Sequence, residues 1–160
     1  MPVAYPLLTG TASPTNGVDE VQRITPGGTI SGGTWRITFE TVQTAAIAWN
    51  ATAADTRAAL EALSNVEPGD VVVTGGPLAS GAFDVTFTRK LGGIDRTQIS
   101  LQSSLTGAAP TITPSTPTAG VRGTYRGAQG GALFVDTTAG RLYENSGTAS
   151  TPVWTEPPVL

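Results

Sequence analysis

The sequence T-A-A-D-T-R-A-A-L-E-A-L-S, residues Thr52 to Ser64, predicts a short helix around which the rest of the chain is organised. Thr52 is a good N-cap, and Asp55 three residues later can complete a capping box. Arg57 and Glu61 are four residues apart on the side that faces water. The inward stripe, at helical spacing, consists of Ala53, Thr56, Leu60 and Leu63. A helix this short is marginal alone, so it must lie on a sheet.

The segments on either side of this helix alternate between apolar and polar residues, as strands with one buried face do. T-W-R-I-T-F-E before the helix and F-D-V-T-F-T after it each turn a row of large apolar side chains to one face. These two rows are Trp35, Ile37 and Phe39, and Phe83, Val85 and Phe87. We expect Leu60 and Leu63 to pack on the face that the rows form.

Strands are expected at residues 21–24, 34–40, 44–49, 70–74, 83–88 and 98–101, and the glycine-rich residues 25–33 are expected to be a loop. The order β-ββ-α-ββ-β with short connections predicts an α+β fold. Residues 18–107 would form a small, mostly antiparallel sheet with one helix packed on a face.

The N-terminal residues 1–17 predict an extended arm, because three prolines and two glycines leave no regular element. The arm nevertheless carries apolar residues, which a free tail rarely does, so we expect it to lie on something. Residues 108–122 contain Pro110, Pro114 and Pro117. This composition predicts a linker, or else an edge strand in which prolines remove hydrogen-bond donors.

The C-terminal residues 123–160 predict a small β-unit with strands near residues 133–136, 142–144 and 153–155. Three strands of this length bury too little apolar surface to be stable alone. We therefore expect the unit to be stable only in a homo-oligomer, a trimer in the simplest case, or when docked on the assembly that the protein binds. The side chains that would need such a partner are Leu133, Val135, Leu142, Val153 and Trp154.

The composition argues against several classes of function. The chain has no His and no Cys, which argues against thiol nucleophiles, His-based triads and nearly all zinc sites. Its net charge is -3 without a clustered basic face, so no nucleic-acid partner is expected. No stretch approaches the roughly 20 apolar residues that span a bilayer, and the N-terminus lacks the features of a signal peptide. We expect no membrane association.

Few of the polar residues occur in patterns that indicate catalysis or ligand binding. The runs T-P-G-G, T-G-G-P and L-G-G lack the context of phosphate-binding loops and are interpreted as turns. The carboxylates Asp84, Asp95, Asp136 and Glu144 form no calcium-loop pattern, and we expect them to be solvated, several of them at turns. We predict no catalytic residues, no metal site and no cofactor, and hence no enzyme.

The run T-A-A-D-T-R-A-A-L-E-A-L-S-N-V-E-P-G-D-V-V-V-T-G-G-P-L, followed by F-D-V-T-F-T-R-K-L-G-G-I-D, resembles a small α+β module of tailed-phage virion proteins, especially from phages of actinobacteria. The resemblance covers about residues 19–101 and departs from the module at Arg89 and Lys90. The ending G-A-L-F-V-D-T-T-A-G-R-L-Y-E-N-S-G-T-A-S-T-P-V-W-T looks like the short β-unit that ends many phage fibre, tail and head-surface proteins. These resemblances imply a virion role and bring no catalytic residues.

The resulting hypothesis is a capsid decoration protein on the outer head surface, made in the cytoplasm of a bacterial host and bound to the major capsid protein. Two alternatives stay open: a minor tail or tail-fibre protein, and a glycan-binding adhesin that uses Trp154 and nearby tyrosines. Trp35 and Trp49 are expected in the core, while Trp154 is expected to reach a partner. The residues predicted to bind partners are Tyr5, Leu7, Leu8, Arg122, Arg126 and Trp154.

Overall fold

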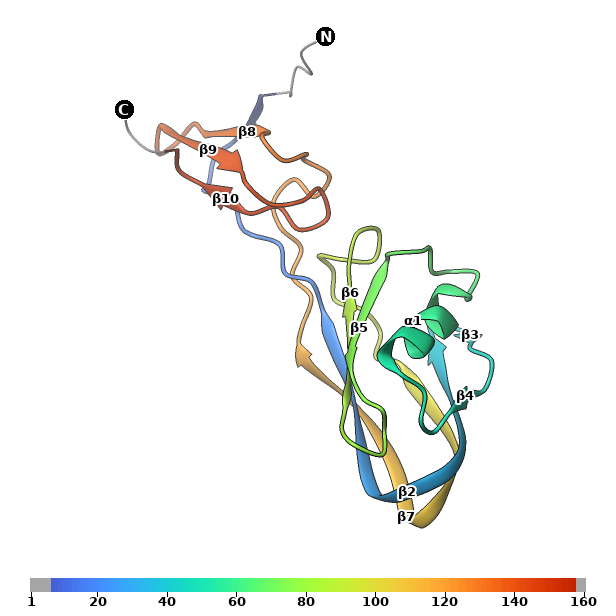
Figure 1. The fold of residues 1–160 in the computed structure, drawn as a ribbon. Helices are drawn as coiled ribbons and strands as arrows, with labels where there is room; N and C mark the ends of the chain where they lie inside the picture. The colour runs from blue at the N-terminus through green and yellow to red at the C-terminus, as the bar shows by residue number, and fades with distance from the viewer. Residues whose placement is uncertain (1–6, 158–160) are drawn as a thin grey trace.

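The structure is a computed structural model that describes residues 7–157. Figure 1 shows two bodies lying end to end, which two neighbouring stretches of chain connect. The larger body contains a 6-stranded sheet and the smaller a 4-stranded sheet. The first described residues and the last ones both lie in the smaller body, so the larger body is inserted between them.

The larger sheet is built around one long strand, β2 (Val21–Phe39), and all its pairs are antiparallel. One side of β2 pairs first with β6 and then, further along, with β4 and β3, while the other side pairs with β7. Strand β5 pairs with the free side of β6. The remaining bounds are β3 (Val42–Gln43), β4 (Ile47–Ala48), β5 (Val71–Gly75), β6 (Phe83–Phe87) and β7 (Ser100–Thr118).

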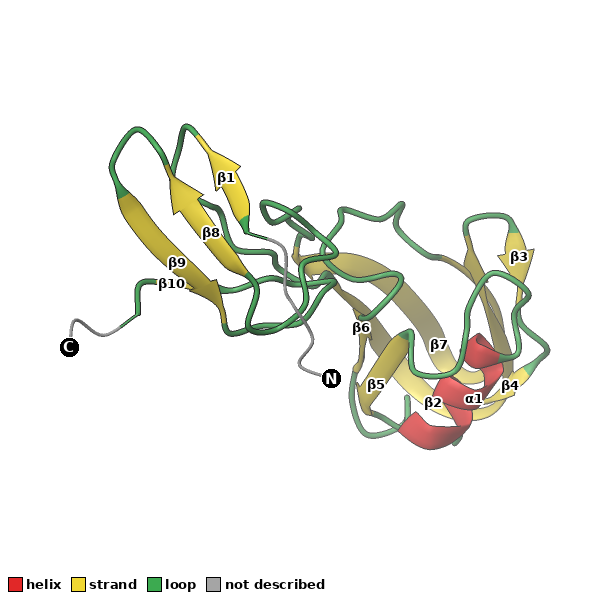
Figure 2. Cartoon of the chain, turned by 90° about the horizontal axis from the view of Figure 1, so that it is seen from above, coloured by secondary structure: helices red, strands yellow, loops and turns green. Residues whose placement is uncertain are grey.

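The predicted helix is present as α1 (Ala53–Glu61), and its capping box is confirmed. The Asp55 backbone N–H donates to Thr52 Oγ1 at 3.2 Å, and the Thr52 backbone N–H donates to Asp55 Oδ2 at 2.9 Å. Arg57 and Glu61 form the expected pair across one turn, at 3.8 Å. Figure 2 shows α1 lying across one face of the sheet. The fold is therefore a small, sheet-dominated α+β fold.

The core of the larger body contains the two predicted apolar rows and both helix anchors. Trp35 stacks on Phe83 with ring centroids 5.8 Å apart, and Phe39 stacks on Phe87 at 5.0 Å. Leu60 is buried in the same cluster, as is Leu63 just beyond the helix end. The alternation therefore predicted the buried face correctly.

The expectation of a loop at residues 25–33 is wrong, because β2 runs through them without interruption. The register with β7 shifts between Gly27 and Thr29 and again between Ile30 and Gly32. Gly28 has a positive φ of 67° and lies against the backbone of Ala109, so a side chain there would collide. Bulges of this kind let a long two-stranded ribbon bend, and the glycines that permit them resemble a loop in the sequence.

The expectation of a linker at residues 108–122 is also wrong, because residues 108–118 form the second half of β7. The alternative of an edge strand matches the structure, since β7 pairs only with β2 in the described chain. Pro110 and Pro114 are four residues apart and so turn their backbone nitrogens to the same side. Proline cannot donate to a ladder, which places these nitrogens on the outer edge. No residue of β7 is charged, so prolines take the protective role that charges usually have at an edge.

Two buried polar side chains, Glu20 and Gln22, hold the segment that leads into β7. Glu20 Oε2 accepts the backbone N–H of Arg96 at 2.6 Å, and Gln22 Oε1 accepts that of Ile99 at 2.7 Å. Buried polar groups are tolerated when they are hydrogen-bonded in this way. Nothing in the local alternation distinguishes Glu20 and Gln22 from the exposed polar residues of a strand.

The smaller sheet has the order β1-β8-β9-β10. Strands β8 (Leu133–Asp136), β9 (Arg141–Asn145) and β10 (Trp154–Thr155) agree with the predicted positions to within one residue at each end. The fourth strand, β1 (Leu8–Gly10), comes from the N-terminal arm and pairs parallel with β8. The described part of the arm therefore lies against another segment, as expected, and that segment is β8 of the same chain.

We expect Leu60→Ala to lower the free energy of unfolding by roughly 2 to 5 kcal/mol, because a buried leucine loses its contacts and leaves a cavity. Arg57→Ala serves as the control. It removes an exposed pair that contributes at most about 1 kcal/mol. Urea denaturation of both variants measures the difference. Equal and small losses would contradict the assignment of the buried helix face.

Candidate functional site

The N-terminal arm is fastened to the C-terminal unit along its described length. Beyond the β1 to β8 pairing, the Tyr143 hydroxyl donates to Ser13 Oγ at 3.0 Å. The Trp154 backbone N–H donates to Asn16 Oδ1 at 2.8 Å, and the Gly17 N–H donates to the Pro152 carbonyl at 2.9 Å. Residues 7–17 are thus part of the small unit, contrary to the predicted division into a separate arm.

The inner face of the small sheet encloses a compact cluster of Ala132, Phe134, Tyr143 and Trp154, which Leu8 and Ala128 partly cover. Trp154 is only 6% exposed, and its Nε1–H donates to the Thr124 carbonyl at 3.0 Å. The expectation that Trp154 reaches a partner is therefore wrong. Tyr143 is buried with it, so these two rings offer no surface on which a sugar could stack.

The outer face of the same sheet is open and apolar. Val135 lies between Thr9 on β1 and Leu142 on β9, and Leu133 lies beside Glu144. Leu133 is 38% exposed and Leu142 is 42% exposed. Leu7, one residue before β1, is 60% exposed and by alternation belongs to the side of Thr9. We call this surface the outer face; it consists of Leu7, Thr9, Leu133, Val135, Leu142 and Glu144.

Clustered exposed apolar side chains usually mark a surface that contacts another molecule. Three of the large apolar residues exposed on the described chain, Leu7, Leu133 and Leu142, lie on the outer face. Leu133 and Leu142 are among the residues that the sequence predicted to need a partner. Their sequence neighbours Phe134 and Tyr143 are covered by the chain itself, whereas Leu133 and Leu142 are not.

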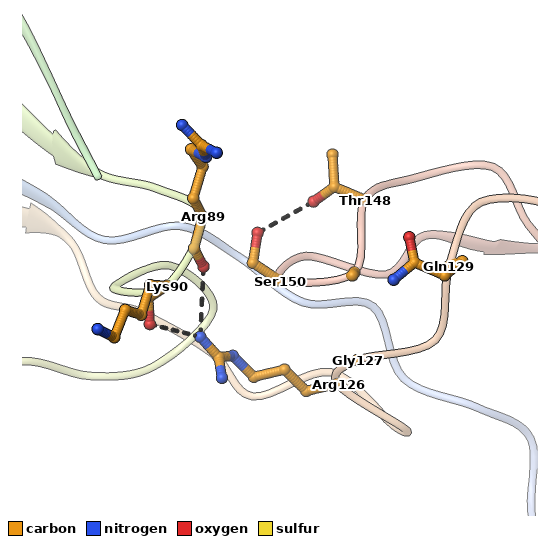
Figure 3. A pocket seen from close by; sticks show the side chains of 8 residues that line it. Arg89, Lys90, Arg126, Gly127, Gln129, Thr148 and Ser150 are labelled. Carbon is orange, nitrogen blue, oxygen red and sulfur yellow. Dashed lines mark hydrogen bonds between the residues drawn. The ribbon is translucent and has the colours of Figure 1, made fainter. Parts of the chain in front are cut away.

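The two bodies meet at a junction that Arg126 crosses. Its Nε donates to the Gly92 carbonyl at 3.0 Å, and its Nη2 donates to the carbonyls of Lys90 at 2.8 Å and Arg89 at 3.4 Å. Figure 3 shows the Arg126 side chain reaching across to these carbonyls. Arg126 was predicted to bind a partner, but its guanidinium joins the C-terminal unit to the loop after β6.

Further contacts fix the same junction. Asp19 Oδ1 accepts the Gly93 N–H at 2.9 Å, and burial raises the pKa of the Asp19 carboxyl above its usual range, which the Gly93 bond and the nearby Arg126 partly offset. Gly93 has a φ of 63° and lies against the Ser150 carbonyl, where a Cβ would collide. Val18 and Val121 exchange two backbone hydrogen bonds of 2.9 Å where the chain crosses between the bodies. The small unit is therefore packed on the large one and not carried away from it.

Comparison with known proteins gives limited information. No family model matches the chain, and no curated protein matches it. One similar solved structure is a chain from Mycobacterium phage Patience, with 19% sequence identity and a TM-score of 0.44. The match covers 91% of this chain and 55% of the other, so this chain spans about half the length of that solved chain. A similarity at this level does not establish a shared function.

The other predicted partner-binding residues lie apart from one another. Tyr5 lies outside the described residues. Leu7 is on the outer face, Leu8 packs on the inner cluster, and Arg122 is exposed between the bodies. The five that the structure describes do not form one site, although Leu8 and Arg126 line the same depression. The sequence analysis did not predict the junction contacts of Asp19 and Gly93. These two residues differ from ordinary loop residues only in the contact that the fold brings about between them.

Two of the candidate carboxylates, Asp136 and Asp84, serve local structure, and Asp136 is buried, contrary to the expectation that it is solvated. Asp136 Oδ1 accepts the backbone N–H groups of Thr138 and Ala139, both at 2.9 Å, and these bonds lower the pKa of its carboxyl. Asp84 pairs with Arg23 at 2.7 Å. Within residues 7–157, no group of three or more potential ligands of the His, Cys, Asp and Glu types comes together to hold a metal. Among the same residues, no helix has the length and apolar character needed to cross a membrane.

We expect Arg126→Ala to destabilise the protein by roughly 1 to 3 kcal/mol, because it leaves junction carbonyls without their donor. Arg122→Ala is the matched control, since it removes a nearby exposed arginine and should change stability by about 0.5 kcal/mol or less. Urea unfolding measured for both variants tests this. Equal stabilities would mean that Arg126 does not hold the junction.

Proposed function

We propose that the protein is a structural component of a phage virion, and that it is a decoration protein which binds the outer surface of the head and stabilises the shell. The sequence resemblance of residues 19–101 to phage modules supplies the class. The observation that carries a binding role is the outer face, where Leu7, Leu133 and Leu142 are all exposed on the same side of the small sheet. Such a face is stabilised when another protein covers it.

The proposed partners are the major capsid protein and further copies of the same chain, in a trimer in the simplest case. Closed symmetry would let each copy cover the outer face of a neighbour without leaving an open edge. From the sequence, an oligomer was expected because three short strands are too small to be stable alone; the oligomer is now proposed because the outer face is exposed. The inner cluster around Trp154 is covered within the chain, so an oligomer would bury the outer face alone. No nucleic acid, membrane, cofactor or catalytic step enters this proposal.

The alternative of a minor tail or tail-fibre protein differs in copy number. A decoration protein covers the shell and should give an abundant band when purified virions are separated on a stained gel. A tail protein is present in few copies and should give a faint band. A faint band would reject the head-surface placement while leaving a virion role intact.

The glycan-binding alternative loses its main support, because Trp154 and Tyr143 are buried. Binding of the purified protein to host cell-wall glycan would be the result that restores it.

The outer face itself is tested by Leu133→Ser together with Leu142→Ser. We expect this variant to bind undecorated heads at least roughly tenfold more weakly, because it removes apolar area from the proposed contact. Val72→Ser is the matched control, since Val72 is 44% exposed on β5 of the other body. Co-sedimentation with heads measures both variants. Equal binding of the two would contradict a role of the outer face.

A further inference from the structure

A groove runs along the junction between the two bodies and combines two depressions. The first, of about 520 Å³, is lined by residues of both bodies, and the second, of about 420 Å³, lies against the small unit. The two depressions are adjacent, since Arg126, Gly127 and Gln129 line both. Binding sites occur preferentially where two packed units meet. We call this surface the junction groove.

The first depression is basic in a protein that is acidic overall. Arg89, Lys90 and Arg126 line it, which is three of the nine Lys and Arg residues of a chain with net charge -3. No Asp or Glu lines it. Glu67 pairs with Lys90 and also lies close to Arg89, and Asp19 lies close to Arg126, so two carboxylates outside the lining offset part of the charge of the three cations. The depression therefore favours a negatively charged ligand.

The wall opposite these cations is neutral and polar. Figure 3 shows Gln129, Thr148 and Ser150 on loops of the small unit, on the side of the depression opposite the segment of Arg89 and Lys90. The Thr148 hydroxyl is fully used by Ser150 and by the hydroxyl and backbone N–H of Thr151, whereas the Ser150 hydroxyl, 3.1 Å from that of Thr148, keeps capacity for a ligand. Such groups suit the backbone amides of a peptide as well as its acidic side chains.

The second depression is apolar. Leu8, Tyr125, Ala128 and Ala132 line it together with the three shared residues. Tyr125 is held in place because its ring packs on Phe134 with centroids 5.3 Å apart and its hydroxyl donates to the Thr9 carbonyl. Its φ is 54°, a conformation that bulky residues rarely adopt and that the surrounding contacts must maintain. The apolar end of the groove is thus preformed.

We propose that the junction groove binds an extended acidic segment of a partner protein, with one apolar side chain in the second depression and acidic side chains beside Arg89 and Arg126. The positive charge of the first depression favours acidic side chains. The apolar second depression favours an apolar side chain close to them in the same segment. An extended chain advances about 3.3 to 3.6 Å per residue, so a segment of a few residues spans both ends. This inference goes beyond the proposed function, because it holds for a head or a tail protein.

The probe is the peptide acetyl-Leu-Asp-Glu-Asp-amide, added to the full-length protein labelled with ¹⁵N. We expect chemical-shift changes at the amides of Gly127, Gln129 and Ser150, with binding that weakens as salt is added. Replacing the acidic residues of the peptide by Asn and Gln, or its Leu by Gly, should each weaken binding. Shift changes confined to other regions, or equal binding of the neutral peptide, would overturn the proposal.

Variants of the protein give the second arm of the test. Arg89→Gln together with Lys90→Gln should weaken peptide binding roughly fivefold, as expected for the loss of two partly exposed charges. The charge-matched control is Arg23→Gln together with Arg57→Gln, which lie away from the groove and should leave binding unchanged. An equal loss in the control would mean non-specific attraction. Displacement of the peptide by inorganic phosphate or a short oligonucleotide at lower concentration would assign the basic end to phosphate and overturn a peptide ligand.

Discussion

The parallel pairing of Leu8–Gly10 with β8 is the contact on which the rest of the small unit depends. Three very short strands cannot bury an apolar cluster alone. The N-terminal segment supplies a fourth strand and, through Ser13 and Asn16, hydrogen bonds to Tyr143 and Trp154. Because the first and last described segments build one sheet, the larger body between them is anchored where the chain enters it and where the chain leaves it. Among the described residues, this closure leaves the inner face of the small sheet largely covered and the outer face exposed, and the outer face is the basis of the proposed function.

The same closure makes the junction rigid. Two adjacent stretches of chain cross it at Val18 and Val121, and Arg126 ties the small unit to the loop after β6. Small residues are needed where backbones meet this closely, as at Gly93. A groove between bodies can hold a ligand in a defined geometry only when the bodies do not move apart. The proposed binding of a ligand in the groove therefore depends on these junction contacts.

Local patterns predicted much of the fold. The capping box at Thr52, the alternating rows that contain Trp35 and Phe83, and the three C-terminal strands are all set by short-range chemistry. Long-range pairing could not be derived from such patterns, because nothing near Leu8 indicates that it pairs with Phe134. For the same reason Arg126 and Trp154 looked like surface residues: their partners lie in distant segments. The glycines and prolines of the β2 and β7 ribbon resembled loops because bulges and edges require the same residues as turns do.

The central claim is that the small unit is completed within one chain, so that its strands need no partner to be stable. Amide hydrogen exchange of the full-length protein, measured over a range of concentrations together with light scattering, tests it most directly. The account predicts that the amides of Phe134, Val135 and Tyr143 are protected to the same degree in dilute monomer as at high concentration. Protection that disappears on dilution, as the protein becomes monomeric, would show that another chain completes the unit and would contradict the account.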